Sequence, residues 1–334
     1  MRVAKLWLGA FCCSLLLATG AQAKEETLPS KIELSSWKVP WDNTRPRDPA
    51  VDSKGNVWFC GQQGNYIAKL DPKTGKFKRF ELSRNTNPHN LIIDDRDMVW
   101  YAGNKNGHIG KLDPITGNIT RYTMPDKAAS DPHTLIQSDR GDIWFTVQWG
   151  NFVGKLKRLS GSIDLYPVPT KDARPYGIKM DKSGQPWVAL LGTNKLATVK
   201  DGDVVEFSLP RAEARPRRLE ISKDGMLWYV DYATGYLGQF NPNDQSVEEW
   251  QLPSGSGAKP YGTALDKNGT LWIADTAEIP NTLYGFDTKA KAFVSQTDVD
   301  FGGHIRHTFY NPKSDKVWFG TDSGYIGNAA PAAE

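Results

Sequence analysis

Short apolar runs alternate with polar turns along almost the whole chain, and this pattern repeats seven times. Each repeat has an apolar run, a tight turn rich in Asp, Lys and Gly, and a second apolar run that carries a tryptophan, as in DPAVDSKGNVWFCG and YGTALDKNGTLWIAD. The tryptophans recur every 41 to 46 residues, at Trp58, Trp100, Trp144, Trp187, Trp228, Trp272 and Trp318. Four short strands per unit at this period predict the blades of a β-propeller.

The two ends of the chain share one incomplete repeat. After Trp318 only one further strand pattern appears, at residues 325–328, so the last unit lacks a fourth strand. Residues 31–37, before the first unit, have the pattern of that missing strand. We therefore predict an all-β fold, a seven-bladed β-propeller of four-stranded blades, in which the N-terminal strand completes the C-terminal blade and covers two exposed edges.

The tryptophans occupy seven equivalent positions, which predicts a packing layer between blades rather than a sugar-binding site. Cys60 lies between Phe59 and Gly61 in a predicted strand, which favours a buried thiol. The other two cysteines, Cys12 and Cys13, belong to the N-terminal apolar segment. The mature chain is therefore expected to have no internal disulfide and to depend on its core for stability.

The first 23 residues differ in composition from the rest. Arg2 and Lys5 precede an apolar run over residues 6–17, and Ala21-Gln22-Ala23 has the form of a cleavage site. This is the pattern of a secretory signal peptide, and the run is too short to span a membrane. We expect residues 1–23 to be removed and residues 24–334 to form a single propeller domain, periplasmic or secreted. We expect that domain to be a monomer without a membrane span.

The charge balance argues against a nucleic-acid partner. The chain has 41 Lys and Arg residues against 38 Asp and Glu residues, a net charge of +3, and no basic cluster. It also lacks the G-x-S-x-G, H-E-x-x-H and P-loop motifs. The expected partner is a small molecule, or a carbohydrate or peptide ligand, at one mouth of the central channel.

The residues at one position of each repeat indicate a ligand-binding surface at such a mouth. The residue 11 before each tryptophan falls in the connection that enters the innermost strand, and all seven residues there are histidine, arginine or tyrosine. Any one of them alone is more readily explained as a turn cap. Because size and polarity persist while the residue type varies, the set together favours a ligand surface. In chain order these positions are Arg47, His89, His133, Tyr176, Arg217, Tyr261 and His307.

Other candidate residues map to the same face. Asp231 and Asp275 lie three residues after their tryptophans on adjacent blades, and a salt bridge from Asp231 to Arg217 is the structural alternative for the first of them. The remaining histidines, His108 and His304, and the rim residue Trp149 also belong there. A histidine of ordinary pKa, about 6.5, can serve as a base at neutral pH. Histidine and carboxylate groups can also hold a divalent metal such as Mg²⁺, for which the sequence assigns no ligands. The predicted catalytic residues are His133, His89, His307, Asp275 and Asp231, and the predicted ligand-binding residues are Arg47, Tyr176, Arg217, Tyr261, His304 and Trp149.

The repeat resembles the virginiamycin B lyase (streptogramin B lyase) family of seven-bladed propellers. The shared pattern of Pro, then His or Tyr, then an apolar residue two positions on appears at residues 88–91, 132–135 and 175–178, with a variant at 260–263. The strand pattern of residues 107–113 also matches. The resemblance covers essentially the whole mature chain and implies a metal-assisted carbon–oxygen lyase that opens the ester of a cyclic depsipeptide by elimination.

The resemblance further implies that two histidines of neighbouring late blades, and a glutamate 14 residues after one of them, carry out the reaction. This sequence has Arg217, Tyr261 and Asp275 at those three positions. The metal-side glutamate of the family falls on Lys259, and Asp131 is the nearest acid placed in the same way before His133.

Two functions stay open from the sequence. One is a lyase-like enzyme acting on an ester, lactone or glycosidic-type bond, and the other is a non-catalytic periplasmic binding propeller. A lactonase-like site on the channel axis would need about three inward-facing carboxylate or Asn ligands, and the sequence offers no clear set.

Overall fold

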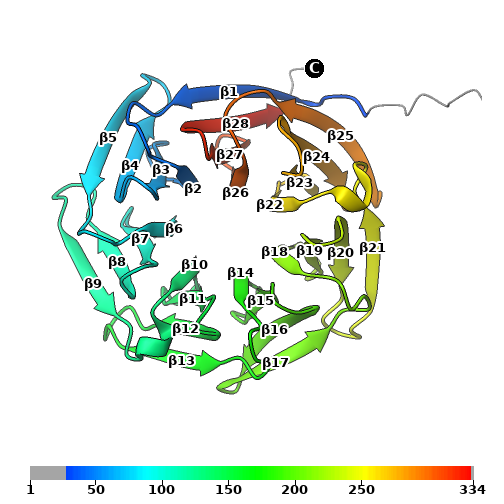
Figure 1. Ribbon diagram of the computed structural model, residues 1–334, viewed down its shortest axis with the longest axis horizontal. Coiled ribbons are helices and arrows are strands. Elements are labelled where there is room, and N and C mark those ends of the chain that lie inside the picture. Colours follow the sequence, from blue (N-terminus) through cyan, green and yellow to red (C-terminus); the bar gives the residue numbers. More distant parts are fainter. Residues whose placement is uncertain (1–27, 332–334) are drawn as a thin grey trace, which may run out of the picture.

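The computed structural model describes residues 28–331 and shows seven four-stranded antiparallel sheets arranged in a ring (Figure 1). Two short 3-10 helices, Lys127–Ala129 and Gly255–Gly257, are the only helices in this range. Between residues 28 and 331, no helix has the length and apolar character needed to cross a membrane. Residues 1–23 lie outside the described residues, so the signal peptide stays a prediction.

Each blade is a sheet of strands that follow one another along the chain, with the first strand innermost. Blades 1 and 2 are β2 (Pro46–Val51), β3 (Val57–Gly61), β4 (Tyr66–Asp71), β5 (Lys76–Glu81) and β6 (Pro88–Ile93), β7 (Val99–Gly103), β8 (His108–Leu112), β9 (Ile119–Thr123). Blades 3 and 4 are β10 (Pro132–Gln137), β11 (Ile143–Val147), β12 (Phe152–Leu156), β13 (Ile163–Pro167) and β14 (Pro175–Met180), β15 (Pro186–Leu190), β16 (Lys195–Lys200), β17 (Asp203–Ser208). Blades 5 and 6 are β18 (Pro216–Ile221), β19 (Leu227–Asp231), β20 (Tyr236–Phe240), β21 (Val247–Gln251) and β22 (Pro260–Leu265), β23 (Thr270–Asp275), β24 (Asn281–Asp287), β25 (Ala292–Val299).

Blade 7 contains both ends of the described chain. Its strands are β26 (Ile305–Asn311), β27 (Lys316–Thr321), β28 (Tyr325–Pro331) and β1 (Ile32–Lys38), with β1 outermost. β1 pairs with β28 from Ile32 opposite Pro331 to Lys38 opposite Tyr325. The predicted closure is confirmed, with the strand one residue later than the sequence pattern indicated. Pairing the two chain ends covers the edges that each would otherwise expose.

An aspartate six residues before the tryptophan builds the turn between the first two strands of several blades. In blade 1 the Oδ1 atom of Asp52 accepts hydrogen bonds from the backbone N–H groups of Lys54 (3.0 Å) and Asn56 (2.8 Å). Its Oδ2 atom accepts the indole N–H of Trp58 at 2.9 Å. Gly55 has φ +85° in this turn, a conformation that glycine adopts without strain. The same carboxylate therefore shapes the hairpin and orients the indole.

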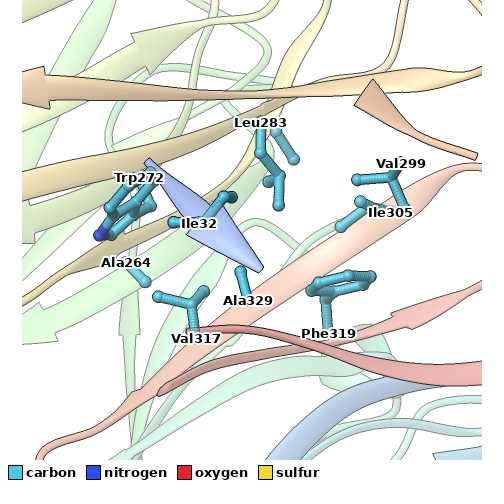
Figure 2. Packing of buried hydrophobic residues seen from close by; sticks show 10 residues of the cluster. Ile32, Ala264, Trp272, Leu283, Val299, Ile305, Val317, Phe319 and Ala329 are labelled. Carbon is cyan, nitrogen blue, oxygen red and sulfur yellow. The ribbon is translucent and has the colours of Figure 1, made fainter. Parts of the chain in front are cut away.

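All seven tryptophans are buried, and each packs against the next blade, as predicted. Figure 2 shows Trp272 of blade 6 in one apolar cluster with Val317 and Phe319 of blade 7 and Ile32 of β1. We call the seven indoles the tryptophan layer. The thiol of Cys60 is free and buried, also as predicted.

Candidate functional site

The seven residues that precede their tryptophans by 11 positions lie in the innermost strands, near their first residues. The expectation that they occupy the connection is wrong, because strand pairing already begins one residue earlier in six blades, for example at Pro88 opposite Gly103, and two residues earlier in blade 7. A register shift follows at this point in all seven blades. Such bulges re-aim side chains. We call this set, Arg47, His89, His133, Tyr176, Arg217, Tyr261 and His307, the channel ring.

Members of the channel ring touch one another across blade boundaries. The imidazoles of His89 and His133 have centroids 3.8 Å apart, and His133 lies 4.1 Å from the ring of Tyr176. Tyr176 and Tyr261 are joined by a hydrogen bond between their hydroxyl groups, although they belong to blades 4 and 6. The four side chains therefore form a continuous row.

Arg217 is held on this row by aromatic faces. Its guanidinium carbon lies 3.6 Å from the ring centroid of Tyr261 and 4.1 Å from that of Tyr232, and its Nη2 donates to the hydroxyl of Tyr176 at 3.2 Å. Cation–π contacts of this kind are worth about 0.5–2 kcal/mol, more as the site becomes drier. The three tyrosines therefore fix the orientation of a cation that stays half-buried.

A second inward layer follows the channel ring directly and was missed by the sequence reasoning. Asp48 is fully buried and accepts hydrogen bonds from Arg47 Nε (2.5 Å) and Asn90 Nδ2 (2.8 Å), while Arg218 Nη2 reaches it at 3.4 Å. Burial alone would raise the pKa of Asp48, but the guanidinium groups of Arg47 and Arg218 hold it well below its usual range. This layer could have been found from the sequence by listing the residue after each ring position, because the bulge turns that residue inward as well.

Arg218 crosses the channel within this second layer. It starts from blade 5, reaches Asp48 on blade 1, and donates from Nη1 to the Thr134 hydroxyl on blade 3 at 3.2 Å. The Thr134 hydroxyl lies 2.8 Å from Nδ1 of His133. The equivalent positions of the two flanking blades are glycines, Gly177 and Gly262, and a Cβ at Gly177 would lie 3.0 Å from the Arg218 Cα. Gly177 thus lets its strand approach Arg218 closely, whereas a Cβ at Gly262 would meet Thr308 of blade 7.

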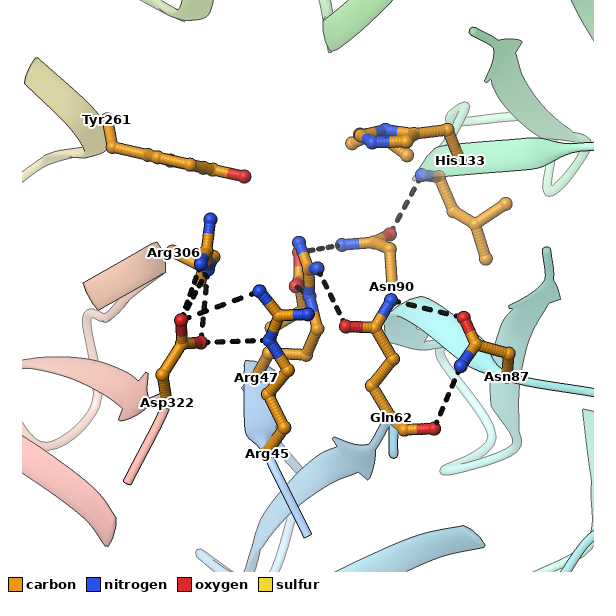
Figure 3. A network of polar contacts seen from close by, with 12 residues as sticks. Arg45, Arg47, Gln62, Asn87, Asn90, His133, Tyr261, Arg306 and Asp322 are labelled. Carbon is orange, nitrogen blue, oxygen red and sulfur yellow. Dashed lines mark hydrogen bonds and ion pairs between the residues drawn. The ribbon is translucent and has the colours of Figure 1, made fainter. Parts of the chain in front are cut away.

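Positive charge dominates this end of the channel. Besides Arg47, Arg217 and Arg218, the guanidinium groups of Arg45 and Arg306 both pair with Asp322, at 3.1 and 2.5 Å (Figure 3). Only Asp48 and Asp322 pair with these five groups among the described residues. The surplus of three positive charges favours an anion.

The histidines of the ring add no charge near neutral pH. Burial, followed by repulsion from nearby arginines, holds the pKa of His89 and His133 well below the ordinary value, and the same two causes act on His307. Their nitrogens His89 Nδ1, His133 Nε2 and His307 Nδ1 have no hydrogen-bond partner within residues 28–331. They are therefore neutral groups with unused hydrogen-bonding capacity.

The same arginines make Tyr261 easier to ionise, whereas they keep the histidines neutral. Burial by itself would raise the pKa of its hydroxyl, but the guanidinium groups of Arg217, Arg47 and Arg218 outweigh this effect and lower the pKa to about 7. Its partner Tyr176 has a raised pKa, because burial and the charge of Tyr261 both disfavour a second phenolate. The pair can thus hold one negative charge at neutral pH.

Asp231 and Asp275, the two predicted carboxylates, end β19 and β23 rather than starting the loops after them. Asp231 accepts the backbone N–H of Arg215 at 2.8 Å and Nη2 of Arg211 at 2.8 Å, so its ionic partner is Arg211 and not Arg217. Asp275 accepts the backbone N–H of Lys259 at 2.7 Å and the Ser254 hydroxyl at 2.5 Å. Both side chains turn back to anchor the incoming connection. Neither contacts a ring histidine within residues 28–331.

The remaining predicted residues are placed differently from one another. Trp149 is 66% exposed, with the guanidinium of Arg174 4.4 Å from its ring centroid. His304 is half-buried in the connection before β26. His108 is buried and lies 3.4 Å from the Tyr101 hydroxyl instead of joining the ring.

An open cleft of about 410 Å³ lies beside Arg217 on the mouth face. Its lining includes Tyr232, Asp172, Arg174 and Arg215. The sequence analysis did not identify the two arginines as site residues. A periodic signal for them exists, because the position two before the ring residue is basic in four blades. Those residues are Arg45, Arg174, Arg215 and Lys259.

A sequence profile of the Virginiamycin B lyase family matches residues 18–281, most of the chain. The chain belongs to this family. Virginiamycin B lyase from Staphylococcus aureus has a similar structure, with a TM-score of 0.82, 22% identity and coverage of 90% of this chain and 100% of that one. A streptogramin B lyase structure matches with a TM-score of 0.82, 23% identity and coverage of 90% and 98%. These identities bear on the fold alone. A search of curated proteins finds no match.

A less similar structure belongs to a larger protein. The extracellular domain of a hybrid two-component system from Bacteroides thetaiotaomicron aligns with a TM-score of 0.72 and 19% identity, over 90% of this chain and 43% of that one.

The metal ion that the family resemblance implies does not fit the site in this chain. Across residues 28–331 no group of three or more His, Cys, Asp or Glu side chains is placed to hold a metal ion. Mg²⁺ prefers several oxygen ligands, whereas the carboxylates of Asp48 and Asp322 are taken up by arginines. Asp131, the nearest candidate by sequence, accepts the backbone N–H groups of Trp149 and Gly150.

Proposed function

We propose that this chain binds a small anionic ligand at the mouth of its central channel. The placement of Arg217 carries the proposal: it is stacked on Tyr261 and Tyr232 and lines the open cleft. A guanidinium binds carboxylates and phosphates through two parallel hydrogen bonds. Because the tyrosines already hold Arg217 in place, little side-chain freedom is lost when a ligand arrives.

The surroundings support an anion rather than a cation. Arg174 and Arg215 line the same cleft with one acid, Asp172. The guanidinium groups on the channel exceed the carboxylates that pair with them, and the ring histidines are neutral at physiological pH. The faces of Tyr232 and Trp149 offer stacking surface for a carbohydrate or peptide that carries the anionic group.

Calorimetric titration with citrate and with trigalacturonate, as anionic probes, tests this function. We expect binding at low salt that weakens as salt is added, and at least about a tenfold loss of affinity in Arg217→Gln, since a charged hydrogen bond contributes about 1.5–3 kcal/mol. Lys73→Gln removes the same charge from the exposed turn between β4 and β5 and should change nothing. Absence of binding to both probes, or equal losses in the two variants, would contradict the proposal.

A carbon–oxygen lyase acting on an ester or lactone at the same mouth is the second candidate, favoured by family membership and by the lowered pKa of Tyr261. In an elimination, a base takes the proton beside a carbonyl, its electron pair forms a carbon–carbon double bond, the C–O bond breaks, and the leaving oxygen gains a proton. The Tyr261 phenolate would be the base, and Arg217 would stabilise the negative charge on the carbonyl. The proton that Tyr261 has taken would then pass to the leaving oxygen, with the neutral imidazole of His133 or His307 as the relay.

Mass spectrometry separates this candidate from simple binding. A catalytically inactive histidine-to-alanine variant of the Staphylococcus aureus enzyme is known in complex with quinupristin, which makes that compound a rational probe. Ring opening by elimination leaves the mass unchanged, whereas hydrolysis adds one water. The double variant His133→Ala/His307→Ala should lose turnover and keep its folded circular dichroism spectrum. Full activity in that variant would remove both histidines from the mechanism.

We also propose that the protein works outside the cytoplasm, as a monomer. The pattern of residues 1–23 supports export, and the similarity to extracellular domains of Bacteroides thetaiotaomicron proteins is consistent with it. Cell fractionation and light scattering on the purified protein test the two statements.

A further inference from the structure

A second hollow lies along the channel, on the far side of the channel ring from the mouth. It has a volume of about 220 Å³ and is lined by residues of all seven innermost strands. Ile93 and Gln137, at the last positions of β6 and β10, are among the lining residues and are half-buried. The hollow therefore opens toward the turns between first and second strands. It shares no lining residue with the cleft at Arg217. We call it the channel cavity.

The walls and the deep end of the channel cavity differ in chemistry. Much of the wall is apolar, with Leu91, Ile178 and Phe309 among its side chains. Arg218 and His307 also line it, next to the ring. Arg218 is 3% exposed, and its Nε has no hydrogen-bond partner within the described range, nor has Nδ1 of His307. Buried polar nitrogens without partners are costly, and a ligand that satisfied them would gain that free energy on binding.

The other charged groups of the cavity cancel each other. Lys179 Nζ lies 2.8 Å from Glu220 Oε2, and the Thr263 hydroxyl donates to Glu220 at 3.2 Å. Asp48 is shared between Arg47 at 2.5 Å and Arg218 at 3.4 Å, so it neutralises Arg218 only in part. Arg218 therefore leaves the deep end of the cavity positive.

We propose that the channel cavity binds a small apolar carboxylic acid, with its carboxylate on Arg218 and His307 and its hydrocarbon part against Leu91, Ile178 and Phe309. The size agrees, because a cavity of about 150 Å³ accommodates benzene and the channel cavity measures about 220 Å³. An aromatic ring with one carboxylate, such as benzoate, matches both the volume and the polarity. This site is independent of the anion site at the mouth.

Calorimetric titration of the purified protein with benzoate and with benzyl alcohol tests the proposal. Both probes have one ring, but only benzoate carries a charge for Arg218. We expect benzoate to bind at least about tenfold more tightly, which corresponds to one charged hydrogen bond. Equal affinity for the two probes would overturn the role of Arg218, and no binding of benzoate would overturn the site.

Three variants locate the binding. Gln137→Phe fills the open end of the cavity without removing a buried apolar contact and should abolish binding of both probes. Arg218→Gln should reduce the preference for benzoate to less than about twofold. Leu159→Ala, in the exposed turn between β12 and β13, should change neither affinity. Circular dichroism reports whether Arg218→Gln still folds; if it does not, the Gln137→Phe result decides by itself. Benzoate binding that survives Gln137→Phe would place the ligand elsewhere.

Discussion

The tryptophan layer and the channel ring lie 11 residues apart in the same repeat, yet the first holds one residue type seven times and the second holds three. Each indole meets the same surroundings, the apolar face of the next blade, so one side chain suits all seven places. Ring residues meet one another across the channel instead. His133 contacts His89 and Tyr176, whereas Arg217 contacts Tyr176 and Tyr261. Equivalent backbone positions therefore have unequal neighbours.

The two layers also differ in how their polar atoms are satisfied. Five of the seven indole nitrogens donate a hydrogen bond to an Asp or Ser of their own blade. In the ring, by contrast, buried nitrogens of Arg47, His89, His133, Arg217 and His307 lack partners within residues 28–331. Unpaired buried groups cost stability, and natural proteins accept that cost mainly where they bind or react. The difference therefore separates the scaffold from the candidate site.

The largest expected effect concerns the closure that keeps the tryptophan layer sealed. Deleting residues 24–40 removes β1, which exposes the edge of β28 and takes Trp37 away from Trp318, now stacked at 5.5 Å. We expect the free energy of unfolding to fall by at least about 5 kcal/mol, because a whole strand and its apolar face are lost. Thermal unfolding measures this, and a truncated protein that melts like the intact one would disprove the closure.

Acid should weaken the ring and not the tryptophan layer. The pKa values of His89, His133 and His307 are lowered in the folded state, so below about pH 6.5 the unfolded chain binds protons that the folded chain does not. Stability is therefore complete above that pH and falls as the pH decreases, by up to about 1.4 kcal/mol per pH unit for each histidine.

Urea unfolding at pH 7.5 and pH 5 tests this sign. The triple variant His89→Gln/His133→Gln/His307→Gln should show a distinctly smaller loss between the two pH values. If the variant and the original protein lose stability equally, the histidines are not the cause.

A smaller effect distinguishes members of the tryptophan layer. Trp58→Phe removes the indole bond to Asp52, whereas Trp318→Phe removes an indole whose nitrogen has no partner among the described residues. Both variants lose similar apolar area. We expect Trp58→Phe to cost about 1 kcal/mol more in unfolding free energy. Equal costs would show that the Asp52 contact contributes nothing to stability.

The smallest effect leaves stability nearly unchanged and reports on the ring alone. The tyrosinate absorbance of the folded protein should show one step near pH 7, from Tyr261, well below the ordinary tyrosine range. Arg217→Gln should move that step to higher pH, because it removes the first of the cations that stabilise the phenolate. Tyr261→Phe should abolish it. A step that persists in Tyr261→Phe belongs to another residue.

Features that repeat along the chain could be predicted from it. The tryptophan spacing gave the blade count, the spare pattern at residues 31–37 gave the closure, and the polar set 11 residues before the tryptophans gave the channel ring. Contacts between repeats could not be predicted. Arg211 was not recognised as the partner of Asp231, because Arg211 lies in the connection before β18 whereas Asp231 ends β19. Asp48 was missed because the bulge turns a second residue inward, and no residue type in the repeat predicts that bulge.

The sequence by itself determined a seven-bladed ring, its closure and its buried tryptophans, because these follow from local periodicity, turn chemistry and apolar burial that each repeat expresses alone. Only the tertiary structure decided what the channel holds. Arg218 reaches from blade 5 to blades 1 and 3, and Tyr176 of blade 4 meets Tyr261 of blade 6. Charge, protonation and cavity shape depend on such distances across the ring. The number of residues between two positions in the sequence does not predict these distances.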